Sequence, residues 1–172
     1  RECCSPLTPK GGTVEDYELL NKIFMSTVNT QSTSTPPAGD GGLVIINYGA
    51  GNIQSIMFAI ERLGYKAVLS NNPEEIKAAD KVIFPGVGEA SYAMKMLQES
   101  GLDTLIPTLK QPVLGICLGM QLMCQSSEEG NTKGLGIFDV DVVKFSSKVK
   151  VPQMGWNTIY NLKSDLFKGI AE

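Results

Sequence analysis

One cysteine stands where an apolar run gives way to a helical pattern, and it is the side chain best placed to do chemistry. Cys117 lies in the segment Gly115-Ile116-Cys117-Leu118-Gly119, with a glycine two residues to either side. This pattern is typical of a nucleophile elbow, a tight strand-to-helix turn in which small neighbours let the backbone and a substrate come close. The N-terminus of the helix is expected to favour the thiolate and to aim backbone N–H groups at a developing oxyanion.

A second turn, rich in glycine, is expected to lie beside the cysteine. The run Phe84-Pro85-Gly86-Val87-Gly88-Glu89 follows another apolar stretch. Because the carboxyl ends of parallel strands meet at one edge of a sheet, the two turns should be neighbours. The free N–H groups of this turn are therefore candidates for a second oxyanion donor. Glycines also commonly end strands, so this turn by itself is weak evidence.

The elements that must position these turns are short apolar strands that alternate with amphipathic helices. Apolar runs without clean alternation predict parallel strands buried on both faces, at residues 43–47, 66–69, 81–84 and 112–116. Helical stripes run from Ile53 to Gly64 and from Ala90 to Gly101, and a third helix begins at Asn72. This succession predicts an α/β fold with a doubly wound, mostly parallel sheet and helices on both faces.

The two ends of the chain differ from this middle part. Residues 1–42 are expected to form one short helix, within residues 14–25, followed by a linker rich in Ser, Thr, Pro and Gly. The globular domain is expected to occupy residues 43–172. Within it, the shorter pieces at 137–145 and 149–159 are expected to form a meander on the edge of the main sheet.

Composition excludes several classes of function. The 172 residues carry a formal net charge of −3 from 15 basic and 18 acidic side chains, and they include no histidine. The scattered charge argues against a nucleic-acid or membrane surface, and no apolar stretch is long enough for a bilayer span. Without imidazole, His-assisted nucleophiles and His-bearing metal sites are excluded for this chain alone. A soluble cytoplasmic protein is expected, with Cys3, Cys4 and Cys124 as ordinary reduced thiols.

Four segments of the chain resemble, in the same order, one branch of the class I, triad-type glutamine amidotransferases. The run Gly-Ile-Cys-Leu-Gly-Met-Gln at 115–121 is similar to the nucleophile motif of that class. Met120, in place of a histidine, resembles the glutaminase subunit of imidazole glycerol phosphate synthase. The other three segments are Asn-Tyr-Gly-Ala-Gly-Asn at 47–52, Pro-Gly-Val-Gly-Glu at 85–89 and Pro-Gln-Met-Gly-Trp-Asn at 152–157. The resemblance covers residues 43–172 and implies a three-layer, flavodoxin-like fold that is incomplete at its C-terminus.

The resemblance implies a glutaminase that supplies ammonia to a cyclase subunit in histidine biosynthesis, as one half of a heterodimer. Cys117 would attack the side-chain amide carbon of L-glutamine, and the N–H groups of Leu118 and Val87 would bind the oxyanion. The glutamine pocket would be lined by Gly86, Gly88, Glu89 and Gln121. The surface that faces the cyclase, which receives ammonia through an internal tunnel, would include Asn47, Gly49, Asn52, Met154, Gly155, Trp156 and Asn157. No metal or organic cofactor is implied.

The chain departs from the family pattern in the catalytic base. The family completes its triad with a His and a Glu in a later segment, and this sequence has no histidine. General acid–base help is worth about 10²–10⁴-fold, so the chain is expected to be inactive by itself. A gene fragment, an artificial fusion and one half of a split protein all fit. The first residue, which is not Met, and the unfamiliar residues 1–42 favour a fragment.

Two other interpretations remain open. The first is a different class I amidotransferase, serving anthranilate or aminodeoxychorismate synthesis, against which the Trp156 segment argues. The second is a binding or regulatory module without catalysis that keeps the fold and the partner surface. An enzyme fragment should regain activity when its missing segment is supplied, whereas a regulatory module should bind its partner without that segment.

Overall fold

The computed structural model describes residues 42–146, 155–156, 158–161 and 167. Contacts within the chain divide it into two compact units: residues 36–153 with residues 1–6, and residues 154–172 with residues 7–35. All the helices and strands given below belong to the first unit. The short helix and linker predicted within residues 1–42, and most of the piece predicted at 149–159, lie outside the described residues.

The main sheet has four parallel strands in the order β2-β1-β3-β4. They are β1 (Leu43–Ile46), β2 (Ala67–Ser70), β3 (Lys81–Phe84) and β4 (Val113–Gly115). The chain moves outward to β2, returns past β1 to β3 and continues to β4, so the sheet is doubly wound. The predicted α/β class and the positions of all four strands are confirmed.

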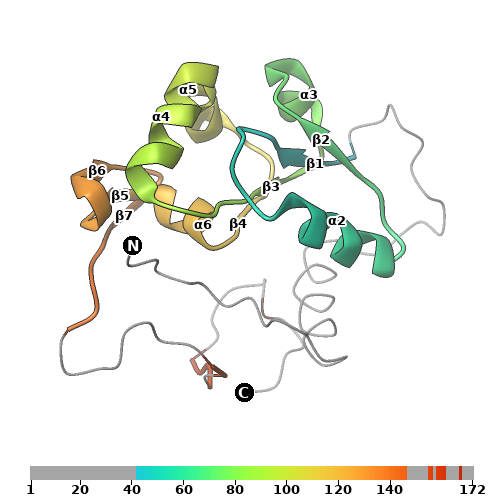
Figure 1. Ribbon diagram of the computed structural model, residues 1–172. Helices are drawn as coiled ribbons and strands as arrows, with labels where there is room; N and C mark the ends of the chain where they lie inside the picture. The colour runs from blue at the N-terminus through green and yellow to red at the C-terminus, as the bar shows by residue number, and fades with distance from the viewer. Residues whose placement is uncertain (1–41, 147–154, 157, 162–166, 168–172) are drawn as a thin grey trace. The chain divides into compact units, whose positions relative to one another are not determined.

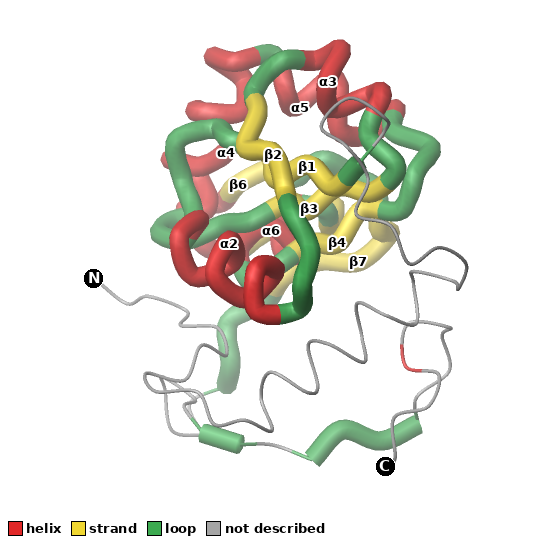
Figure 2. The backbone as a smooth tube through the Cα atoms, turned by 90° about the vertical axis from the view of Figure 1, so that its right-hand side faces the viewer, coloured by secondary structure: helices red, strands yellow, loops and turns green. Residues whose placement is uncertain are grey.

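Helices connect these strands and cover both faces of the sheet. They are α2 (Ile53–Arg62), α3 (Pro73–Ala78), α4 (Ala90–Ser100), the short α5 (Leu102–Leu105) and the 3₁₀ turn η1 (Ile106–Thr108). In Figures 1 and 2, α3 and α5 lie on one side of the sheet and α2 lies on the other. The ends of these helices follow from the sequence, since Asn72 accepts from the Glu74 N–H at 3.0 Å and Gly101 ends α4 at φ 69°.

Successive side chains of the central strands point to opposite faces of the main sheet and contribute to the apolar layer on each face. Val44 and Ile46 of β1 belong to the main core cluster, which also contains residues of α3, α4 and α5. Ile45 and Ile83 are also buried, but they lie outside that cluster. Because successive strand residues point to opposite faces, these two isoleucines face the layer that contains α2. Burial on both faces is therefore confirmed for β1 and β3.

The predicted burial of the second strand on both faces is wrong. Val68 and Leu69 of β2 are 50% and 42% exposed. The strand lies at the edge of the sheet, where β1 is its only neighbour in the order given above. An edge strand loses the cover that a second neighbouring strand and its helix would give, and both of its faces become accessible.

The region after residue 123 forms a second, three-stranded sheet. It contains β5 (Cys124–Ser127), β6 (Thr132–Lys133) and β7 (Phe138–Val142), in the order β6-β5-β7, with the 3₁₀ turn η2 (Glu129–Asn131) before β6. The pair β5 and β6 is antiparallel, and the pair β5 and β7 is parallel. The predicted meander on the edge of the main sheet is therefore wrong for residues 138–142, because β5 offers them a different partner.

Two kinds of feature are absent from the part of the chain that the structure describes. No helix there is long and apolar enough to cross a membrane. Nor do three or more His, Cys, Asp or Glu side chains come together there in a group that could hold a metal ion.

Candidate active site

Cys117 occupies a strained junction between strand and helix. Cys117 lies two residues beyond the end of β4, after Ile116, and directly precedes α6 (Leu118–Leu122), with φ 60° and ψ −122°. A non-glycine residue at positive φ carries a strain of about 1–3 kcal/mol, which persists only where the surroundings hold it. Two backbone hydrogen bonds provide that support: the Ile116 N–H donates to the Phe84 oxygen at 2.9 Å, and the Gln121 N–H donates to the Cys117 oxygen at 3.2 Å. The strand–turn–helix geometry that the sequence predicts is present.

The two glycines around the cysteine serve close packing. A β-carbon added at Gly115 would lie 2.7 Å from the Cα of Met120, and one added at Gly119 would overlap the Phe84 carbonyl oxygen. Neither contact could be relieved by moving the end of a flexible side chain, because the neighbouring atoms belong to the backbone. Residues 115–119, called the elbow from here on, therefore require glycine at both ends for reasons of space.

The second turn, residues 85–88, packs against the elbow. A β-carbon added at Gly86 would lie 2.8 Å from both the carbonyl carbon and the Cβ of Leu118. The backbone of this turn, called the glycine turn below, therefore touches the first residue of α6. The expectation that parallel strands bring the two turns together agrees with this contact.

The two predicted oxyanion donors lie on these touching turns. Leu118 is buried, and as the first residue of α6 it has no intrahelical acceptor for its N–H. Val87 lies at the middle of the glycine turn with its side chain 48% exposed. The structure thus brings both residues close to Cys117 in the fold, and their function as oxyanion donors stays a prediction.

Glu89, predicted to line the substrate pocket, caps α4. Its carboxylate accepts hydrogen bonds from the N–H groups of Ser91 and Tyr92, both at 3.3 Å, and from the Ser91 hydroxyl at 2.7 Å. The Ser91 hydroxyl is the main reason that the pKa of Glu89 lies below its usual value. Gly88, at φ 97°, lies exposed beside it, and Gln121 is half-buried on α6. Contact of these residues with glutamine stays a prediction.

A buried tyrosine that the sequence does not single out reaches the glycine turn. The Tyr48 hydroxyl donates to the Pro85 carbonyl oxygen at 2.9 Å, and the Tyr48 ring lies 5.6 Å from the Phe84 ring. Burial raises the pKa of Tyr48 well above its ordinary value, and the charge of Cys117 raises this pKa further. Tyr48 therefore stays protonated near the cysteine. No local pattern could reveal a contact across 37 positions.

The start of α4, just beyond the glycine turn, is held by a hydrogen bond. The carboxylate of Glu129, in η2, accepts from the Ala90 N–H at 3.1 Å. A β-carbon added at Gly130 would lie 3.0 Å from the Cβ of Ser91. The loop between β5 and β6 therefore packs on the first turn of α4, next to the residue that ends the glycine turn.

The residues predicted to face a partner fall into two groups. In the first unit, Gly49 and Asn52 are exposed and Asn47 is half-buried, and Asn52 caps α2 by accepting from the Ser55 N–H at 3.4 Å. In the second unit, Gly155 and Trp156 are exposed. Met154 and Asn157 lie outside the described residues. A partner interface stays a prediction for all of them.

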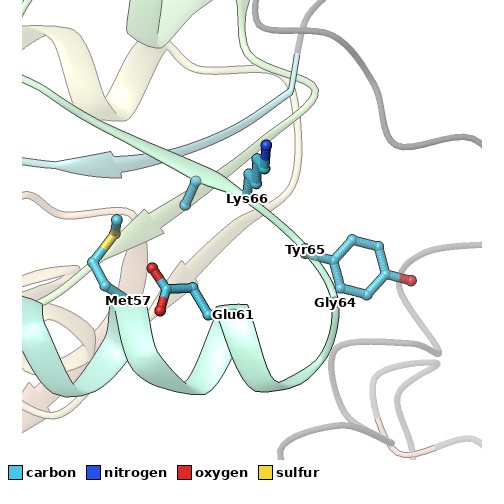
Figure 3. Close-up of a pocket in the computed structure, with 6 residues that line it drawn as sticks. Met57, Glu61, Gly64, Tyr65 and Lys66 are labelled. Carbon is cyan, nitrogen blue, oxygen red and sulfur yellow. The ribbon is translucent and has the colours of Figure 1, made fainter.

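A hollow of about 500 Å³ lies away from the cysteine. It is lined by Met57, Glu61, Gly64, Tyr65, Lys66 and Ala67, at the connection from α2 to β2 (Figure 3). Ala67 pairs with Leu43, the first residue of β1, so the hollow lies at the amino ends of the strands. Cys117 follows the carboxyl end of β4. The hollow is therefore at the opposite end of the sheet from the elbow.

Comparison with known proteins agrees with this geometry. The family model for class-I glutamine amidotransferases matches residues 44–172. A HisH subunit of imidazole glycerol phosphate synthase from Bacteroides fragilis is 62% identical over 132 residues, which cover 75% of this chain and 67% of that protein. The HisH subunit from Bacteroides thetaiotaomicron is 54% identical over 133 residues, covering 76% of this chain and 68% of that protein.

More distant relatives and a solved structure point the same way. A HisH subunit from Haemophilus influenzae is 46% identical over 132 residues, covering 76% of this chain and 66% of that protein. A crystal structure described as a glutamine amidotransferase has a TM-score of 0.51 at 21% identity and covers 58% of this chain and 55% of that chain, which supports the fold. The chain belongs to the class I glutamine amidotransferase family, in the branch formed by the HisH subunits of imidazole glycerol phosphate synthase.

Proposed function

We propose that Cys117 is the nucleophile of a glutaminase that supplies ammonia to the cyclase subunit of imidazole glycerol phosphate synthase, in histidine biosynthesis. One observation carries the proposal: Cys117 sits at positive φ between β4 and α6, with the backbone of the glycine turn packed on the first helical residue. This arrangement places a half-buried thiol beside two backbone segments that can donate N–H groups. Acyl transfer from an amide needs those two components.

The proposed reaction has two covalent steps. The Sγ atom of Cys117 forms a bond to the side-chain amide carbon of glutamine, the thiol proton moves to the amide nitrogen, the carbon–nitrogen bond breaks, and ammonia leaves. Water then forms a bond to the thioester carbon, one of its protons returns to the sulfur, the sulfur–carbon bond breaks, and glutamate leaves with the thiol of Cys117 restored. In both steps, the N–H groups of Leu118 and Val87 would bind the negatively charged oxygen. Gly86, Gly88, Glu89 and Gln121 would line the pocket that holds the substrate.

Proton transfer is the part of the reaction that this chain does not support. The sequence has no histidine, and Tyr48, whose pKa is raised by burial and further by the charge of Cys117, remains a protonated phenol. A phenol that stays protonated cannot accept the thiol proton at neutral pH. We therefore propose that the 172-residue chain does not turn over glutamine and that a His and a Glu from a further segment must complete the triad.

The proposed partner is a cyclase subunit, with which the chain would form a heterodimer in the cytoplasm. The relatives are named as subunits of a synthase, which supports an obligatory partner. The exposed residues Gly49, Asn52 and Trp156 are the proposed contacts, together with Asn47, Met154, Gly155 and Asn157. The names of the relatives also favour this function over an amidotransferase of anthranilate or aminodeoxychorismate synthesis.

The test is glutamine hydrolysis, measured with and without a cyclase subunit. Two chains should be compared: this one, and a version extended by a family-type C-terminal segment that contains the His and the Glu. Activity in the extended chain alone, abolished by Cys117→Ser, would support the proposal. Hydrolysis by the 172-residue chain would contradict the missing-base argument.

The absence of histidine favours a second candidate, a binding module without catalysis. Such a module would bind the cyclase equally well with and without the extension, and neither form would hydrolyse glutamine. Cys117→Ser would leave its partner binding unchanged.

A further inference from the structure

The glycine turn depends on contacts from outside itself for its shape. Gly86 packs on the backbone of Leu118 and Gly119, whereas no atom lies within 4 Å of the β position of Gly88, whose φ is 97°. At its start the Pro85 carbonyl accepts from the Tyr48 hydroxyl, and two residues beyond its end the Ala90 N–H donates to the Glu129 carboxylate. The turn is therefore a short segment held by contacts with other parts of the chain.

We propose that Tyr48 is a positioning residue for the glutaminase reaction: its hydroxyl fixes the plane of the Pro85–Gly86 peptide and thereby the direction of the Val87 N–H. This inference rests on the proposed function. Tyr48 does not touch the reacting atoms in this account. It acts through the carbonyl group of Pro85, to which it donates a hydrogen bond at 2.9 Å.

The geometry explains how one hydroxyl can control this peptide. A peptide unit is planar, and in the trans form its C=O and N–H point in opposite directions. Holding the Pro85 oxygen therefore also holds the Gly86 N–H. Gly86 in turn packs against Leu118, and the next peptide carries the Val87 N–H. The fixed plane of the Pro85–Gly86 peptide and the packing of Gly86 would together set the direction of the Val87 N–H, the proposed oxyanion donor.

The loop that carries Tyr48 also contacts Pro85 directly. A β-carbon added at Gly51 would lie 3.0 Å from the Cβ and 3.2 Å from the Cγ of Pro85. The 47–52 loop therefore contacts both the ring and the carbonyl group of the proline. Three neighbours, Tyr48, Gly51 and Leu118, thus enclose the first two residues of the glycine turn.

Packing alone does not account for a tyrosine at this position. Tyr48 is 3% exposed, and its ring already packs on Phe84. A phenylalanine would make the same ring contact without bringing a hydroxyl into the core. A buried hydroxyl is unfavourable unless it is hydrogen-bonded, and here its recorded acceptor is the carbonyl of the glycine turn.

The test uses an electrophile that adds reversibly to Cys117. Its adduct is stabilised by the oxyanion donors, and because no group leaves, the reaction does not depend on the general base that turnover requires. The nitrile analogue of glutamine, 2-amino-4-cyanobutanoic acid, would react reversibly with the wild-type chain. The Sγ atom of Cys117 forms a bond to the nitrile carbon, the thiol proton ends on the nitrile nitrogen, and no group leaves. Negative charge develops on that nitrogen, where the oxyanion would lie. Mass spectrometry of the intact chain at several nitrile concentrations gives the adduct affinity.

Alkylation by iodoacetamide is the matched reaction, because it needs an accessible thiolate but no oxyanion donor. For Tyr48→Phe we expect the adduct affinity to fall about tenfold while the alkylation rate of Cys117 changes less than twofold. The control variant is Tyr92→Phe, which removes the hydroxyl of a tyrosine that is 59% exposed on α4 and should change neither reaction.

Each other outcome decides against a specific claim. Equal losses in both reactions would show that Tyr48 only supports the fold, and no loss in either would show that its hydroxyl positions nothing. Both results overturn the inference and leave the proposed function standing. A wild-type chain that is alkylated at Cys117 but takes up no nitrile would overturn the inference, because the chain would then form no oxyanion site for Tyr48 to position. Glutamine hydrolysis by the extended chain would decide the proposed function separately.

A second variant covers the case in which Tyr48→Phe fails to fold. Incorporation of 3-fluorotyrosine at position 48 keeps the ring and makes the hydroxyl a stronger donor. We expect the adduct affinity to rise about twofold with unchanged alkylation by iodoacetamide. An unchanged adduct affinity would overturn the inference.

Discussion

Gly119 packs directly on the carbonyl group of Phe84. The first turn of α6 thereby touches the last residue of β3, although the chain reaches α6 only after β4. A β-carbon at position 119 would also lie 2.9 Å from the Pro85 oxygen, the atom to which Tyr48 donates. The elbow that carries the nucleophile and the glycine turn therefore pack directly on each other, so a substitution in either should alter the conformation of the other.

Gly119→Ala should destabilise the fold because its added carbon meets backbone atoms that cannot move aside. Overpacking of this kind costs about 1–3 kcal/mol. The expected result is a lower free energy of unfolding in urea. Gly42→Ala is the matched control, since no atom lies within 4 Å of the β position of Gly42. Equal stability of the two variants would contradict the close packing of α6 on β3.

Cys117→Gly should be more stable than Cys117→Ala, the reverse of the usual order. Glycine ordinarily destabilises helices and strands by about 0.5–1 kcal/mol relative to alanine. At φ 60° the β-carbon of alanine keeps the strain that glycine removes, and the release of about 1–3 kcal/mol should exceed the usual penalty. Urea unfolding of the two variants, with wild type as reference, measures the difference. A more stable alanine variant would show that the junction is unstrained.

The two described cysteines should differ in reactivity by at least about tenfold, since the thiolate is the reactive form. Cys117 is half-buried, whereas Cys124 is buried, and burial together with the charge of Asp141 raises the pKa of Cys124. At pH 8 iodoacetamide should therefore modify Cys117 first, as peptide mass spectrometry would show. In concentrated guanidinium chloride the two rates should become equal. A faster reaction of Cys124 in the folded chain would contradict its described burial.

The main sheet could be predicted because local patterns specify it. Asn72 and Gly101 mark helix ends through their own side-chain and backbone chemistry, and β3 matches the predicted range 81–84. The burial of β2 could not be predicted, because Val68 and Leu69 are as apolar as the residues of the central strands. Position in a sheet is a property of the whole topology, which an isolated apolar run does not encode.

The second sheet and part of the site depend on contacts between distant residues. β5 has the sequence Cys-Gln-Ser-Ser, without alternation or β-branched residues, so its strand conformation comes from pairing with β6 and β7. The sequence predicts the elbow because Cys117 and its two glycines lie within five consecutive residues. The sequence does not predict the role of Tyr48, because the carbonyl that accepts from its hydroxyl lies in another loop.

Glu89 should stabilise α4 in a pH-dependent way. Its pKa in the folded chain is lowered, mainly by the Ser91 hydroxyl, so the folded state favours the ionised carboxylate. The stabilisation is therefore fully present above the unfolded pKa of about 4.3 and is lost as the pH falls through the lower folded value. Glu89→Gln keeps an oxygen that can accept from the Ser91 N–H but removes the charge that favours the helix N-terminus.

We expect Glu89→Gln to have a lower urea midpoint than wild type at pH 7, and the two midpoints to converge as the pH falls below the lowered pKa of Glu89 in the folded chain. Ser91→Ala should reduce the pH dependence of the wild-type stability, because the hydroxyl is the largest cause of the shift. The double variant should show no further loss at pH 7 from Ser91→Ala, since the charge that the hydroxyl stabilises is already absent. A midpoint difference that stays unchanged as the pH is lowered through this range would contradict a role for the charge of Glu89 in stabilising α4.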